Sequence, residues 1–234
     1  MSFEQFEAIV WWLVAVMQFS ILVPMAVVWW GQRHFSAPVK MLSWYVYISA
    51  FFSLGARLSA IYLHNNLFFL IGFNIAKVLL LAAVYRLVLT APRTRWVLAI
   101  ATLAALGVVA ASFALGVPRA VTVSRVVQCA LLAGFALAYL EQGLNRTDSG
   151  KFSGDPIWLL SVGQLIYSAT TVSTFSIEIV TLFEGSIFNT FSALSFSLAS
   201  LVFNYFLTLA FLRATPDIPV RIAVASTESR LVAS

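Results

Sequence analysis

Seven long apolar segments constrain the fold of this chain more than any other feature. A hydrocarbon core about 30 Å thick requires about 20 apolar residues at a helical rise of about 1.5 Å each. Charged residues make up 10% of the 234 residues, whereas a soluble domain carries about 25%. We therefore predict an all-α membrane protein, with a seven-transmembrane-helix bundle over residues 1–213 and a cytoplasmic tail over residues 214–234. The predicted spans are residues 7–30, 40–63, 67–89, 96–116, 120–140, 157–182 and 187–213.

The first span carries interface markers at both ends and a proline inside. Tryptophan favours the two membrane–water interfaces, and the pairs Trp11–Trp12 and Trp29–Trp30 are separated by about one hydrocarbon thickness. Pro24 is expected to kink this helix, because proline removes a backbone N–H from the helical ladder.

The distribution of Lys and Arg predicts the orientation of the spans. Basic residues are enriched on the cytoplasmic side of membrane proteins. Ten of them flank the first, third and fifth connections or follow the last span, whereas Arg119 and Arg125 lie toward the other side. The N-terminus is therefore predicted outside and the C-terminus in the cytoplasm, in a bacterial cytoplasmic (inner) membrane crossed several times. The ten residues are Arg33, Lys40, Arg86, Arg93, Arg95, Arg146, Lys151, Arg213, Arg221 and Arg230.

The sixth predicted span carries a polar face. Gln164, Tyr167, Thr171, Thr174 and Glu178 recur at spacings of three and four residues, which places them on one side of a helix. Lipid cannot satisfy such groups, so the face is expected to point into the protein or a wet cavity. Two alternatives remain open: hydrogen bonding between helices for the face as a whole, and an interfacial position for Glu178.

Two cations lie within the second and third predicted spans. Lys77 is close to the middle of its span and one turn from Asn74, so its side chain is expected to face the bundle. Arg57 and Glu178 have similar depths, which makes an ion pair between them possible. The alternative for Arg57 is that its side chain extends to the outer surface.

These groups predict a polar core that opens outward and binds a small anionic or polar ligand. Arg125 enters the fifth predicted span from the outer surface, with Gln128 one turn deeper, and Asn189 lies near the outer end of the seventh. The candidate ligand-binding residues are Arg57, Asn74, Lys77, Arg125, Gln164, Tyr167, Thr171, Glu178 and Asn189.

Several functional classes are disfavoured by the sequence. Microbial rhodopsins link retinal to a lysine in the seventh helix with carboxylate partners in the third. Here the seventh span has no lysine and the third has no Asp or Glu, so no retinal or other cofactor is expected. One cysteine and two histidines exclude a four-ligand zinc site of those residues. Enzyme motifs such as HExxH, GxSxG and the P-loop do not occur, which indicates a non-enzymatic role. The scattered basic residues indicate no nucleic-acid partner.

Parts of the chain resemble a known group of proteins. The turn Asn65–Asn66 and the motif Trp158…Leu165-Ile166-Tyr167 are similar to those of uncharacterised small seven-helix integral membrane proteins of bacteria, found mostly in Bacteroidota. Some members of that group accompany sensor kinases, so the resemblance implies a sensory role. Where the third helix of the group usually carries a carboxylate, this chain has Lys77.

The sequence therefore favours a receptor-like or sensory membrane protein that signals through a separate partner, such as a sensor kinase. Two other classes remain open. One is a small-solute transporter or channel that uses the polar faces as a pathway. The other is an accessory subunit of a larger membrane complex.

Overall fold

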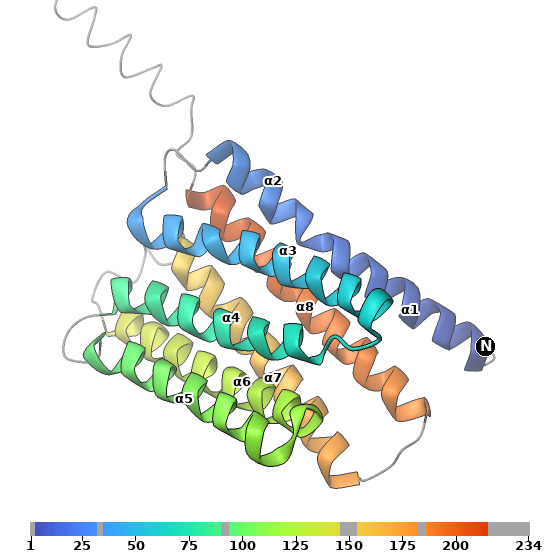
Figure 1. Cartoon of the computed structure of the whole chain (residues 1–234). Coiled ribbons are helices and arrows are strands. Elements are labelled where there is room, and N and C mark those ends of the chain that lie inside the picture. Colours follow the sequence, from blue (N-terminus) through green and yellow to red (C-terminus); the bar gives the residue numbers. More distant parts are fainter. Residues whose placement is uncertain (1–2, 32–34, 90–93, 146–153, 182–185, 215–234) are drawn as a thin grey trace, which may run out of the picture.

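The computed structural model describes residues 3–31, 35–89, 94–145, 154–181 and 186–214, and these ranges contain eight helices and no strand (Figure 1). The prediction of an all-α fold is therefore confirmed. The helices are α1 (Phe3–Ser20), α2 (Leu22–Gly31), α3 (Ala37–Leu63), α4 (Leu67–Val88), α5 (Thr94–Leu115), α6 (Val117–Leu144), α7 (Pro156–Thr181) and α8 (Ser186–Ala214).

Within the described ranges, six segments are long and apolar enough to cross a membrane. They comprise α1 together with α2, followed by α3, α4, α5, α6 and α8. Large apolar side chains are exposed along these helices, for example Trp12, Phe113 and Leu137, as expected for surfaces in contact with lipid. The protein is therefore a multi-pass membrane protein. The helix α7 is 26 residues long but does not belong to this set, because polar residues such as Gln164 and Thr171 lower its hydropathy.

The first predicted span is a pair of helices with a break at Ile21. The break lies where Pro24 would have donated a backbone hydrogen bond to the carbonyl of Ser20, four residues earlier. The Ser20 hydroxyl donates to the carbonyl oxygen of Met17 at 2.6 Å, and Asn204 Nδ2 of α8 donates to the Ser20 hydroxyl at 2.7 Å. The predicted kink at Pro24 is thus confirmed, and α8 supplies a hydrogen bond at the break.

Local sequence signals set several of the helix ends. Gly116 alone joins α5 to α6, with φ at +81°, a conformation that glycine adopts without a steric penalty. Asp155 precedes Pro156 at the start of α7, and its Oδ1 accepts the backbone N–H of Ile157 at 2.9 Å. The other carboxylate oxygen of Asp155 accepts the hydroxyl of Tyr139, which ties the start of α7 to α6.

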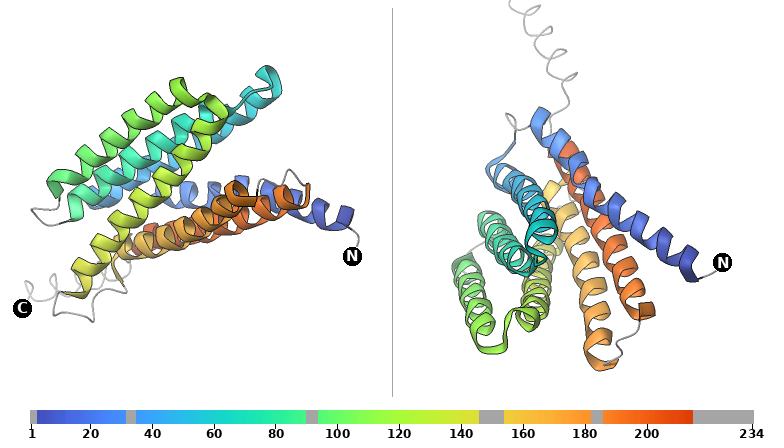
Figure 2. Two further views of the ribbon diagram at one scale, coloured as in Figure 1. Left: turned by 90° about the horizontal axis from the view of Figure 1, so that it is seen from below. Right: turned by 45° about the vertical axis from the view of Figure 1, so that its right-hand side comes forward.

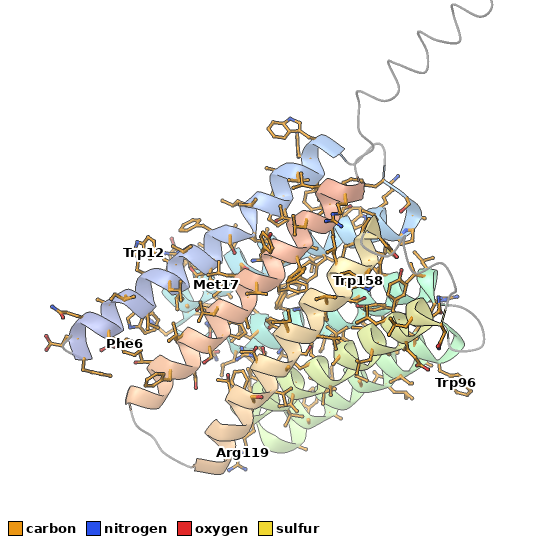
Figure 3. All side chains as sticks on the ribbon, turned by 180° about the vertical axis from the view of Figure 1, so that it is seen from behind. Phe6, Trp12, Met17, Trp96, Arg119 and Trp158 are labelled. Carbon is orange, nitrogen blue, oxygen red and sulfur yellow. The ribbon has the colours of Figure 1, made fainter. Side chains whose placement is uncertain are left out.

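In the bundle, α7 packs between α6 and α8. Helix α4 contacts α3, α5 and α6, and both α1 and α2 pack against α8. In the left view of Figure 2, α6 and α7 converge where α6 ends and α7 begins, and they diverge toward the opposite end. Figure 3 shows Trp96 at the first of these ends and Arg119 at the other.

Apolar packing fills the end where α6 and α7 converge. The larger buried cluster joins α3, α4, α6, α7 and α8 there, close to the helix ends that carry Arg86 and Arg213. Its completely buried large side chains include Leu42, Leu81, Tyr85, Leu132, Leu160, Leu207 and Phe211. A smaller cluster lies toward the opposite end, between α4, α5 and α6. The larger cluster extends to Cys129, Tyr167 and Phe203, which lie beside the buried polar residues described next.

Candidate functional site

Lys77 lies in the middle of α4 with its side chain inside the bundle. Only 2% of its surface is exposed. Its Nζ lies 3.9 Å from the ring centroid of Tyr167, 4.6 Å from that of Phe203 and 5.6 Å from that of Tyr45. Cation–π attraction extends to about 6 Å, so all three rings contribute. The ammonium group is therefore surrounded by aromatic faces from three other helices, α7, α8 and α3.

Arg125 approaches the same region from α6. Its guanidinium is half-buried, with Cζ 4.5 Å from the ring centroid of Phe175 on α7 and 5.0 Å from that of Phe196 on α8. Electrostatic repulsion between Arg125 and Lys77 reaches across the site. Two cations thus line the same part of the bundle.

One turn further along α6, Gln128 and Cys129 are also turned inward. Residues three and four positions apart share a helix face, so both follow from the orientation of Arg125. Cys129 is completely buried. Gln128 is 1% exposed, and neither its Nε2 nor its Oε1 has a hydrogen-bond partner.

The predicted polar face of α7 is buried at Gln164, Tyr167 and Thr171, whereas Thr174 is partly exposed. Gln164, Tyr167, Ser168 and Thr171 are all buried, and Gln164 Nε2 donates to the Ser168 hydroxyl at 2.9 Å. The Gln164 Oε1 and the Thr171 hydroxyl have no hydrogen-bond partner. Tyr167 directs its hydroxyl toward Thr171 and Gln128, although neither contact has the geometry of a normal hydrogen bond. An unpaired buried polar group costs about 1–3 kcal/mol of stability. This part of the bundle therefore contains polar groups whose hydrogen bonds no described protein group satisfies.

These contacts define a site between α4, α6 and α7, with Arg125 at its edge. We call the following five residues the polar core: Lys77, Gln128, Cys129, Tyr167 and Thr171. Most of the described Asp and Glu side chains lie near helix ends, far along the sequence from these positions. Among the described side chains, no Asp or Glu forms an ion pair with Lys77 or Arg125, and no group of three His, Cys, Asp or Glu could hold a metal ion. The polar core is therefore a cationic site with aromatic walls.

Asn74 lies one turn from Lys77 but faces a different neighbour. Its Nδ2 donates to the Ser124 hydroxyl of α6 at 2.7 Å, and that hydroxyl donates to the carbonyl oxygen of Val121 at 2.7 Å. A small void beside this pair is lined by α4, α5 and α6, including Gln128, and has room for about one water molecule. Asn74 thus joins α4 to α6 and borders the polar core.

Arg57 lies apart from the polar core. Its side chain is exposed, and Nη1 donates to Gln18 Oε1 of α1 at 3.2 Å. Arg57 is thus not among the residues that the structure brings together in the polar core, and it binds the neighbouring α1 instead. The side chains of Glu178 and Asn189 lie outside the described residues, and so does the postulated Arg57–Glu178 pair.

Sequence reasoning identified Tyr167 but not the other two aromatic residues around Lys77. Tyr45 and Phe203 lie on α3 and α8, and each is typical of an ordinary core position when read alone. Tyr45 precedes the buried Ser49 by one turn, a spacing that places both on one face of α3. That spacing is the only sequence signal for Tyr45, and Phe203 carries none.

The Asn74–Ser124 hydrogen bond yields a stability prediction. We expect Asn74→Ala and Ser124→Ala to show a coupling energy of about 0.6 kcal/mol and no more than about 1.7 kcal/mol, the range for hydrogen bonds between membrane helices. The measurement is a double-mutant cycle of unfolding free energies in detergent micelles. As a control, Thr102→Ala removes a hydroxyl that bonds only to Leu98 of its own helix, and its effect should add to that of Asn74→Ala. A coupling of zero between Asn74 and Ser124 would contradict the assignment.

Comparisons with known proteins identify no relative of this chain. No protein-family model, no curated protein and no solved structure matches it significantly. The fold and the polar core are therefore the observations on which a function can be argued.

Proposed function

We propose that this chain is a receptor-like, seven-span membrane protein whose polar core binds a small ligand from the outer side and signals to a separate partner. The bundle would adopt two helix arrangements with different affinities for the ligand, since a ligand can shift an equilibrium only by its differential affinity. In this proposal the protein is not an enzyme and carries no cofactor. It lies in a bacterial cytoplasmic membrane, and a sensor kinase is the expected type of partner.

The observation that supports a receptor most directly is the packing on one side of the polar core. Leu132 follows Gln128 by one turn on α6, and Leu81 follows Lys77 by one turn on α4. Both side chains are completely buried, and with Tyr85 and Leu160 they belong to the cluster that fills the converging end. A pathway that carries a solute across the membrane needs polar groups or open space at the depth of Leu81 and Leu132. The buried apolar cluster therefore favours a site with one entrance over a transport pathway.

The inclusion of α7 as a seventh span rests on its surroundings. This helix has the length of a span, 26 residues, and packs against α6 on one side and α8 on the other. Its polar residues face these neighbours, so a low hydropathy is compatible with a position inside the bundle. With α1 and α2 forming one span, the total is seven, and the basic residues favour an outside N-terminus and a cytoplasmic C-terminus.

The contacts of Tyr167 offer a route from ligand to helix packing. Its ring touches Lys77 and lies 5.7 Å from the ring of Phe203 on α8. A ligand that draws the ammonium group away from these rings would change how α4, α7 and α8 pack together. Toward the converging end, the Tyr85 and Ser161 hydroxyls lie 3.0 Å apart and join α4 to α7. A shift of α7 would therefore be transmitted to the side that carries most basic residues.

Accessibility to a membrane-impermeant thiol reagent tests the receptor proposal. In a Cys129→Ala background, single cysteines would be placed at Arg119, Arg125 and Leu132, and labelled in right-side-out and inverted vesicles. The first two positions are exposed and half-buried, whereas Leu132 is completely buried. We expect Arg119→Cys and Arg125→Cys to react only in right-side-out vesicles, and Leu132→Cys in neither preparation.

Two outcomes would contradict the proposal. Labelling of Leu132→Cys in inverted vesicles would indicate a path through the bundle and favour a transporter or channel. Labelling of Arg119→Cys only in inverted vesicles would reverse the orientation of the whole chain.

A further inference from the structure

We propose that the ligand of the polar core is a small monocarboxylate, whose two oxygens bind Lys77 and Arg125. This inference rests on the proposed function only in taking the polar core as the ligand site. It adds the chemical class of the ligand and the two residues that select it.

The first argument is the charge of the site. Lys77 is buried against rings, Arg125 is half-buried, and no described Asp or Glu is paired with either. A single negative charge beside Lys77 therefore neutralises the part of the site that is most deeply buried.

The second argument is the set of unpaired groups that face the site from separate helices. Tyr167 links them, because its ring lies against the Lys77 ammonium and its hydroxyl faces Gln128 and Thr171. Gln128 and Thr171 are each 1% exposed and unpartnered. Their amide N–H groups and hydroxyl are hydrogen-bond donors. Lys77, Gln128 and Thr171 thus offer donors from α4, α6 and α7 to one anion.

The third argument concerns the kind of anion. The guanidinium group of Arg125 presents paired N–H donors that match the two oxygens of a carboxylate. A carboxylate can therefore bond to Arg125 and Lys77 at once, whereas a halide offers a single centre. The walls are aromatic: the ring of Tyr167 lies 6.2 Å from that of Phe196 and 5.7 Å from that of Phe203. Such walls suit a ligand with a short apolar body behind its carboxylate group.

Thermal unfolding of the purified full-length protein in detergent tests this inference. The probes are sodium propionate and its uncharged analogue propionamide, each titrated at constant ionic strength with sodium chloride. We expect propionate to raise the melting temperature by about 5 °C at about 100 times its dissociation constant, and propionamide to leave it unchanged. Lys77→Gln and Arg125→Gln should each weaken propionate binding about tenfold or more. Arg119→Gln is the matched control, because Arg119 is exposed at the far end of α6 (Figure 3) and should leave binding unchanged.

Three results would overturn the inference. Equal stabilisation by propionate and propionamide would indicate a ligand selected for polarity rather than charge. Saturation by chloride alone would identify a halide site. Unaltered propionate affinity in Lys77→Gln would place any bound carboxylate elsewhere on the protein. Failure of the receptor proposal is distinguishable from these, because propionate binding combined with labelling of Leu132→Cys from the cytoplasmic side would retain the carboxylate site and reject the one-sided receptor.

Discussion

Replacing Lys77 with methionine is expected to stabilise the protein. Removing a buried ion from water costs several kcal/mol, and replacing buried charges with apolar residues of similar size often stabilises a protein by about 1–4 kcal/mol. The three rings around Lys77 offset part of that cost, at about 0.5–2 kcal/mol for each cation–π contact. Methionine is unbranched like lysine and retains favourable contacts between sulfur and aromatic rings. We therefore expect Lys77→Met to melt at a higher temperature than the parent chain in detergent, and to lose its response to propionate.

The matched control for this substitution is Lys40→Met. Lys40 is exposed at the start of α3, and surface substitutions change stability by about 0.5 kcal/mol or less. A lower melting temperature for Lys77→Met, with Lys40→Met unchanged, would show that the ammonium group stabilises the fold. The polar core would then have a structural role, and the buried charge of Lys77 would no longer be an argument for a bound anion.

Replacing Gly163 with alanine is expected to destabilise the packing of α7 on α8. A Cβ at Gly163 would lie 2.6 Å from the Cβ of Phe206, which is fixed to the α8 backbone and cannot rotate away. The helices must separate to admit the methyl group, and overpacking of this kind costs about 1–3 kcal/mol. Small residues at such positions allow close approach of membrane helices. We expect Gly163→Ala to lower the melting temperature by several degrees.

Gly134 on α6 provides the matched control. A Cβ there would meet nothing within 4 Å, so Gly134→Ala should be neutral or stabilise the helix by about 0.5–1 kcal/mol through its reduced conformational freedom when unfolded. If both substitutions changed the melting temperature alike, the α7–α8 interface would be looser than described.

The lengths of several helices were predictable because bilayer thickness sets the length of a membrane-spanning helix. The expected bounds 67–89 differ from α4 (Leu67–Val88) by one residue at one end, and 157–182 differ from α7 (Pro156–Thr181) by one residue at each end. Pro24 predicted the break at Ile21, since a missing N–H acts on the carbonyl four residues before it. Helix lengths and helix breaks of this kind can be predicted without knowing how the helices pack.

The polar core was predictable only in part. A repeat of three and four residues predicted that Gln164, Tyr167 and Thr171 share a face, and all three side chains are buried. The partners of that face depend on how helices pack, which no single segment encodes. For the same reason, Arg57 was expected in the core but contacts α1, and the Phe203 ring beside Lys77 had no signal of its own.

The most direct test of the proposed anion site is to measure where a bound carboxylate lies relative to Lys77. An experimental structure with bound bromobenzoate would locate the ligand through the anomalous scattering of bromine. We predict that its carboxylate oxygens lie about 2.7–2.9 Å from Lys77 Nζ and from a guanidinium nitrogen of Arg125, the distance of charge-assisted hydrogen bonds. A bromine signal only at the lipid-facing surface, or a protein carboxylate bonded to Lys77, would contradict the assignment of this polar core as an anion site.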